Sequence, residues 1–247
     1  MSTPHHRVLL KLIKDNSGKP TKQSFLDTYL GNDHIKYPID NPTLRMIARE
    51  WMRAHKTLTP DEFRDILTSL FEAESCTEKM MAGILMGYSA KAQRNFDPMI
   101  FDQWLDHLIG WVEVDTLCTG DFITTQLPAH WPKWKKLIIR LSKDKNINKR
   151  RASLVLFCSP LGRVKDDDIA EVALQIIERL KHEKPVLITK AISWVLRSMI
   201  KHYRQTVSDY LDENTDTLPK IAVRETNKKL DTGRKSGKAS KNLKFKI

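Results

Sequence analysis

Apolar residues recur at helical spacing along almost the whole chain, and this periodicity constrains the fold more than any other feature. The clearest case follows the aspartates at 166–168, where apolar side chains hold the i, i+3, i+4, i+7, i+8 and i+11 positions of one helix face: Ile169, Val172, Ala173, Ile176, Ile177 and Leu180. The aspartates suit the N-cap and first turn, where they oppose the helix dipole. Glycines and runs of β-branched residues are scarce. The sequence therefore predicts an all-α fold.

A second helix start is marked by Thr59 as a cap and Pro60 at the first helical position, ahead of an apolar stripe that begins at Phe63. The same periodicity predicts further helices over these segments: 4–14, 22–30, 42–55, 78–91, 98–110, 132–143, 150–158, 186–203 and 206–213. Amphipathic helices with short connections pack either as a bundle or as a stacked solenoid.

Some of these segments resemble one another, because each places a charged or long residue before small and apolar ones: 81–85, 151–155, 190–194 and 220–224. The last three begin 39 and 30 residues apart, an interval that fits a two-helix repeat of the HEAT type. We therefore expect a HEAT-like helical-repeat solenoid over residues 1–226, with a concave surface. A compact bundle is the alternative that periodicity leaves open.

Basic residues outnumber acidic ones, with 42 Lys and Arg against 30 Asp and Glu, a formal charge of +12 and a pI near 9.6. Cations placed on phosphates release counterions, so this excess favours a basic, DNA-binding concave groove. A solvated surface without a partner would give the same composition. Residues 227–247 hold eight Lys or Arg and one acid, which predicts a disordered basic tail that either grips DNA nonspecifically or only aids solubility.

The sequence argues against disulfide bonds, a zinc site and a membrane segment. The cysteines, Cys76, Cys118 and Cys158, are far apart and odd in number, so we expect neither a disulfide framework nor a zinc site. The apolar run 8–13 is interrupted by Lys11, and is too short and too charged for a signal peptide or a membrane span. We expect a cytoplasmic monomer, nucleoid-associated if bacterial.

Two segments together supply an aromatic ring, an acid and two cations: the first holds the ring and the acid, and the second holds the cations. Trp111 and Asp115 lie four residues apart, so they project from one face if the segment is helical. Arg150 and Arg151 open an apolar helix. An aromatic wall, a carboxylate and cations suit a cationic or sugar-phosphate ligand. Taken singly, Trp111 is more often a core residue, and Asp115 a cap or a surface ion pair.

A third segment places Lys190, Trp194 and Arg197 on adjacent turns of one helical stripe. Taken alone, Trp194 would be interpreted as a core residue, and Arg197 as a solvent-exposed surface residue. The coincidence of such residues in corresponding repeats is what favours a functional surface. Lys190 and Arg197 are therefore candidates for contact with DNA phosphates.

From about residue 21 to 230, the chain resembles the AlkD-like DNA alkylation-repair glycosylases, which are built from HEAT-like repeats. The resemblance is densest in RRASLVLF at 150–157 and KAISWVLR at 190–197, and Trp111 with Asp115 matches the W-x-x-x-D pattern of the family. It implies that Asp115 is the catalytic carboxylate and that Trp111 and Trp194 hold the deoxyribose of the damaged nucleotide.

The resemblance also implies that Arg151 anchors the adjacent DNA backbone and that Tyr29 is an aromatic residue at the cleft. Arg150, its neighbour in the basic cluster, is a further candidate for contact with DNA. The chain departs from the family where Gly110 precedes Trp111 in place of a second tryptophan. One wall of the cleft would then be more open.

The expected function is hydrolysis of the N-glycosidic bond of alkylated purines, such as 3-methyladenine and 7-methylguanine, in double-stranded DNA. These bases are already cationic, so the enzyme needs a carboxylate to stabilise positive charge on the sugar rather than a proton donor. This chemistry requires no metal and no organic cofactor. Two alternatives are a noncatalytic HEAT-repeat protein that binds branched or damaged DNA, and a protein-interaction solenoid with incidental charge. Asp115 separates the first reading from both.

Overall fold

A computed structural model describes residues 2–22 and 33–234 of the chain. These residues form α-helices and two short 3-10 helices, η1 (Lys91–Arg94) and η2 (Leu105–His107), with isolated bridges but no β-strand among them. No helix in the described ranges is long and apolar enough to cross a membrane. The all-α prediction is confirmed.

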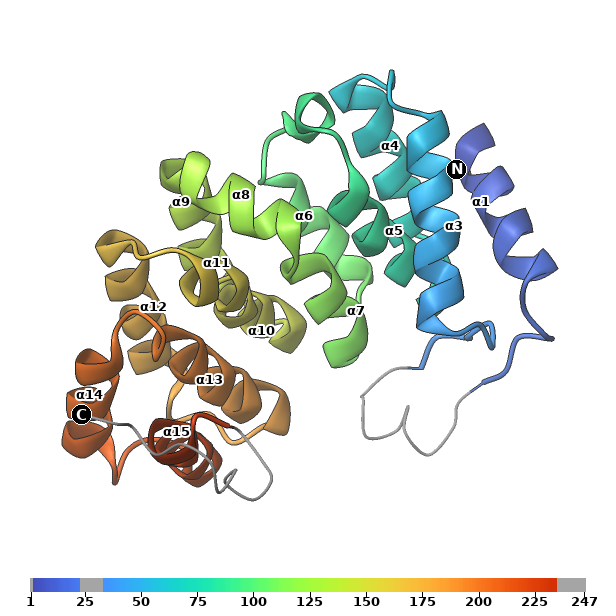
Figure 1. The fold of residues 1–247 in the computed structure, drawn as a ribbon. Coiled ribbons are helices and arrows are strands. Elements are labelled where there is room, and N and C mark those ends of the chain that lie inside the picture. Colours follow the sequence, from blue (N-terminus) through green and yellow to red (C-terminus); the bar gives the residue numbers. More distant parts are fainter. Residues whose placement is uncertain (1, 23–32, 235–247) are drawn as a thin grey trace, which may run out of the picture.

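The helices form two layers that follow a curved path (Figure 1). Consecutive helices of the inner layer contact one another: α3 (Asn41–Ala54), α5 (Cys76–Tyr88), α7 (Gly110–Cys118), α10 (Ile147–Val155), α13 (Val186–Met199) and α15 (Lys220–Thr232). The outer layer and its connections comprise α1 (Pro4–Asp15), α4 (Pro60–Phe71), α6 (Ile100–Trp104), α8 (Asp121–Ala129), α9 (Trp131–Leu141), α11 (Cys158–Arg163), α12 (Asp167–Leu180) and α14 (Arg204–Asn214). This arrangement is the helical-repeat solenoid that the repeats predicted.

Helix starts follow the expected capping chemistry. The side chain of Thr59 accepts from the backbone N–H of Glu62, whose carboxylate accepts from the Thr59 N–H, which completes a capping box. Asp166 likewise accepts from the N–H of Ile169 at the start of α12. The stripe that follows is buried, as its periodicity predicted.

Several boundaries differ from the sequence-based expectation. The helix expected over 98–110 is broken, since α6 ends at Trp104, a 3-10 turn follows, and Gly110 with φ 74° opens α7. Helices α8 and α11 were not expected; both are short, and each contains a proline, Pro128 in α8 and Pro160 in α11. The helix expected over 186–203 already ends at Met199.

The basic tail begins later than the sequence indicated. Residues 227–232, expected to be disordered, form the last turns of α15, which ends at Thr232 and is capped by Gly233 in the left-handed conformation. Half-buried Leu230 packs against the core, and the Lys229 ammonium donates to the carbonyl of Arg197 at 2.8 Å. These contacts hold the segment to α13 despite its charge. Residues 235–247 lie outside the described ranges, as does most of the expected helix at 22–30.

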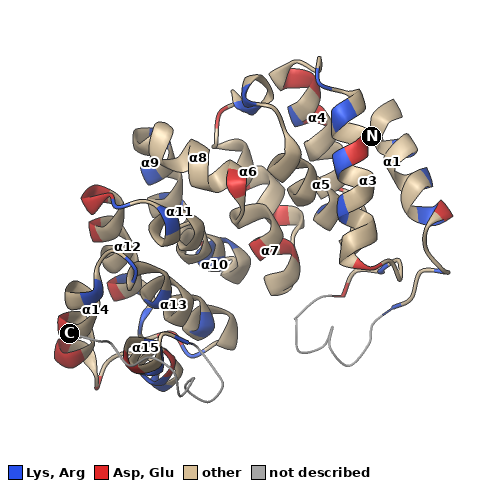
Figure 2. Ribbon diagram, in the orientation of Figure 1, with Lys and Arg blue, Asp and Glu red and all other residues tan. Residues whose placement is uncertain are grey.

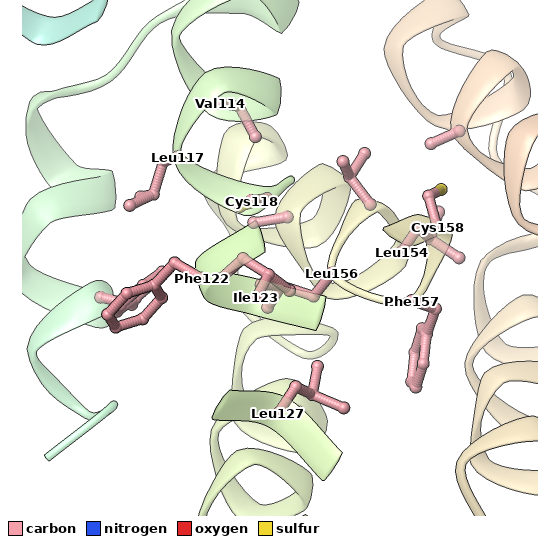
Figure 3. Packing of buried hydrophobic residues seen from close by; sticks show 14 of the residues in the cluster. Val114, Leu117, Cys118, Phe122, Ile123, Leu127, Leu154, Leu156, Phe157 and Cys158 are labelled. Atoms are coloured by element: carbon pink, nitrogen blue, oxygen red, sulfur yellow. The ribbon is translucent and has the colours of Figure 1, made fainter. Parts of the chain in front are cut away.

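The core runs through the layers and fixes α7 against α10. Figure 3 shows apolar side chains of α7 and α8 meeting those of α10, α11 and the turn between them: Val114, Leu117, Cys118, Phe122, Ile123, Leu127, Leu154, Leu156, Phe157 and Cys158. On the other side, α5 approaches α7 closely at Gly83, where an added Cβ would lie 2.6 Å from the backbone oxygen of Thr116. These two contacts set the position of the α7 face that carries Asp115.

Candidate active site

Asp115 and Arg151 form a two-pronged ion pair between α7 and α10. Arg151 Nε donates to Asp115 Oδ1 at 2.9 Å, and Nη2 donates to Oδ2 at 2.7 Å. The remaining guanidinium nitrogen, Nη1, donates to the carbonyl of Leu187 in the first turn of α13. Arg151 therefore ties together three successive inner helices, and it holds the carboxylate in one orientation because the guanidinium fork is rigid.

The pair is largely removed from water. The side chain of Arg151 is 6% exposed and that of Asp115 is 13% exposed. Burial raises the pKa of the Asp115 carboxyl, while the hydrogen bonds and the charge of Arg151 oppose that rise. The thiol of neighbouring Cys118 is fully buried, and its pKa is raised by burial and by the Asp115 charge. Arg151 is thus the group that favours the ionised form of Asp115.

Asp115 borders a cleft of about 700 Å³ bounded by α3, α5 and α7. Trp111, one turn earlier on α7, lines the same cleft and is 37% exposed, so its ring is not a core residue. The shared face predicted from their spacing is therefore present. Tyr88 adds a second exposed ring to the lining, which also includes buried Tyr37, and Arg45 adds a cation. A carboxylate beside exposed aromatic faces suits a ligand that carries positive charge.

Trp194 lies on α13, half-buried and packed against the core. The described lining of the cleft contains neither Trp194 nor Arg151. The first turn of α13 is nonetheless joined to Asp115 through Arg151. Tyr29 falls outside the described residues, so its expected place at the cleft stays a prediction.

Like Arg151, the other two arginines expected to contact DNA already have protein partners. Arg150 donates from Nε and Nη2 to the Glu183 carboxylate at 2.7 and 3.0 Å, and from Nη1 to two carbonyls of the preceding loop. Arg197 donates to Ser193 Oγ at 3.1 Å and lies 3.6 Å from the carboxylate of Glu225 on α15. Burial lowers the pKa of Arg197.

Lys190 is half-buried on α13 and also interacts within the protein. The roles of Arg150, Lys190 and Arg197 in DNA binding remain predictions, as does that of Arg151.

The structure adds residues that the sequence did not single out. Glu113, fully buried on α7, accepts from the backbone N–H of Ile109 and lies 2.8 Å from the His34 ring nitrogen, so it fixes the start of α7 below the cleft. Arg45 could have been found from the arginines spaced four apart at 45, 49 and 53. Across the described ranges, no group of His, Cys, Asp and Glu is arranged to hold a metal ion.

The fold and the site together define a helical-repeat protein that presents an arginine-held carboxylate beside a tryptophan in an open cleft. A model of the DNA alkylation repair enzyme family matches residues 11–230, and the chain belongs to this family. The resemblance seen in the sequence is confirmed. Membership in a family of DNA repair enzymes supports a role in DNA repair and implies that the substrate is DNA.

Two solved structures are similar to this fold. One is a predicted DNA alkylation repair enzyme from Enterococcus faecalis, 17% identical, with a TM-score of 0.66 over 82% of this chain and 92% of its own. The other is smu.31 from Streptococcus mutans UA159, 15% identical, with a TM-score of 0.58 over 91% of this chain and 98% of its own. At these identities the likeness shows the fold alone. No curated protein matches the chain.

Proposed function

We propose that the protein is a monofunctional DNA glycosylase that hydrolyses the N-glycosidic bond of purines alkylated at N3 or N7 in duplex DNA. The observation that carries this proposal is the carboxylate of Asp115, held by Arg151 at the border of a cleft that also exposes Trp111. Membership of the repair family makes damaged DNA the substrate to consider first.

The residue types fit the reaction. Alkylation at N3 or N7 gives the purine a positive charge, so the bond to C1′ breaks with its electron pair going to the base, which leaves neutral. Positive charge then develops on the sugar, and the fixed Asp115 carboxylate stabilises it electrostatically. Water adds to C1′ and loses a proton. The indole face of Trp111 offers its negative quadrupole to the same charge.

Arg151 acts as a positioning residue in this scheme. Its fork occupies one lone pair on each carboxylate oxygen, and each oxygen keeps a further acceptor site for water. Without the guanidinium, burial would favour a protonated Asp115, which could neither stabilise the sugar cation nor orient a water by accepting its proton. The ion pair therefore preserves the charge that the reaction requires.

The same ion pair also suits a second function. A salt bridge that joins α7, α10 and α13 would serve a noncatalytic solenoid that only binds branched or damaged DNA. The two functions differ in their product. The purified protein, incubated with methylated duplex DNA, should release free 3-methyladenine or 7-methylguanine, measured by mass spectrometry. Tight binding of damaged or branched DNA with no base released would reject the glycosylase and favour the scaffold.

A further inference from the structure

Three arginines form a ladder along one face of α3, at positions 45, 49 and 53. Residues four apart on a helix lie one above the other, so these side chains project in nearly the same direction. All three are exposed, while the opposite face, with Leu44, Ala48 and others, is buried. Figure 2 shows the basic residues along this helix.

The ladder differs from Arg150 and Arg151 in that its arginines have no carboxylate partner among the described residues. Within the described part of the chain, Arg45, Arg49 and Arg53 form no ion pair, although Glu50 lies on the same helix. By contrast, Arg150 and Arg151 are both held by carboxylates through two hydrogen bonds each. Cations left unpaired on an exposed face are available to a polyanion, and they release counterions when they bind one.

The ladder is continuous with the cleft that contains Asp115. Arg45 lines that cleft, while Arg49 and Arg53 line a neighbouring hollow of about 320 Å³ together with Lys56. Tyr88, at the end of α5, borders both spaces and is 38% exposed. A strand that passes through the cleft would therefore meet the ladder next.

We propose that Arg45, Arg49 and Arg53, with Lys56, bind the phosphates of a DNA strand beside the nucleotide held in the cleft. The nine residues from Arg45 to Arg53 span about 12 Å along the helix, which matches three or four base-pair steps of about 3.4 Å along the axis of duplex DNA. Tyr88 lies between the two spaces and packs against the intervening sugar. This inference rests on the proposed function only in placing the damaged nucleotide in the cleft.

The test compares two double charge reversals. Arg49→Glu with Arg53→Glu alters the ladder, while Lys135→Glu with Lys136→Glu makes the same change in net charge on exposed residues of the outer helix α9. Affinity for an undamaged duplex is measured across a salt series. The ladder variant should bind at least tenfold more weakly, and its slope of log affinity against log salt should be shallower by about two.

The α9 variant should change the affinity much less and leave the slope almost unaltered. Equal losses in the two variants would show a general effect of charge, and wild-type binding by the ladder variant would place DNA elsewhere; either result overturns the proposal. Arg49→Gln with Arg53→Gln serves as a milder variant, and thermal melting establishes that each protein is folded. Failure of the glycosylase alone gives a different pattern, with no base release but ladder-dependent binding.

Discussion

Replacing Arg151 by methionine is expected to destabilise the protein strongly, because it leaves a buried carboxylate without its partner. Arg151 is 5% exposed and donates three hydrogen bonds, two to Asp115 and one to the carbonyl of Leu187. Removing one member of a buried ion pair costs about 3–5 kcal/mol. For a domain of this size each kcal/mol lowers the melting temperature by about 2–4 °C, so we expect a fall of roughly 6–20 °C.

The loss should depend on pH in a direction that the ion pair fixes. Arg151 lowers the pKa of Asp115 and burial raises it, so the Arg151→Met substitution raises the pKa in the folded state further. A carboxyl whose folded pKa lies above its unfolded value contributes stability below the unfolded pKa, and loses it as pH rises through the folded pKa. The destabilisation should therefore be large at pH 7 and shrink towards pH 4.

Thermal and urea unfolding at pH 7 and pH 4 measure both effects. Arg64→Met is the control, because Arg64 pairs with exposed Asp65 and such a pair contributes little. Adding Asp115→Leu to Arg151→Met should restore part of the lost stability, since no unpaired charge is then buried. A loss below about 1 kcal/mol, or one that is as large at pH 4 as at pH 7, would refute the reasoning.

Three further results are expected. Trp111→Ala should weaken excision by the equivalent of about 1–3 kcal/mol while thermal melting changes little, because the ring is 37% exposed, and Trp111→Phe should retain more activity; a large fall in melting temperature would assign the ring to the core. Gly83→Ala should cost about 1–3 kcal/mol, since its Cβ would lie 2.6 Å from the Thr116 carbonyl oxygen, whereas Gly87→Ala meets nothing within 4 Å and should be tolerated in the same denaturation assay. Ending the chain after Arg234 should preserve the melting temperature and base release but reduce nonspecific DNA affinity, whereas ending it after Thr226 should lower the melting temperature by removing the Lys229–Arg197 contact.

The fold was predictable from the sequence where local signals agreed. The apolar stripe that begins at Ile169 correctly predicted α12, and the aspartates before it predicted its N-cap. The four-residue spacing of Trp111 and Asp115 correctly predicted that both lie on one face of α7. Helices α8 and α11 were not predicted; both are short, and each contains a proline, Pro128 in α8 and Pro160 in α11. Pro160 is tolerated because it lies in the first turn of α11, where a backbone N–H would have no intrahelical partner, and Pro128 lies one residue before the end of α8.

The ion pairs at the site could not be predicted from the sequence, because they are tertiary contacts between different helices. Asp115 and Arg151 are 36 residues apart, and their contact depends on how α7 packs against α10. Arg150 and Arg151 are adjacent and chemically identical in sequence, yet one holds Asp115 and the other holds Glu183. Only the packing shows which cations are paired, and that the exposed ladder lies instead on α3.

The most direct measurement is the single-turnover rate of methylated-base release by Asp115→Asn, with Glu183→Gln as the matched control. Each substitution removes the charge of a carboxylate that a neighbouring arginine holds through two hydrogen bonds, but only Asp115 borders the cleft with Trp111. We predict that Asp115→Asn slows release by about 10²-fold or more, roughly 3 kcal/mol, with unchanged or higher affinity for intact DNA, while Glu183→Gln releases base at the wild-type rate. Wild-type release by folded Asp115→Asn, or an equal loss in both variants, would contradict catalysis by this carboxylate.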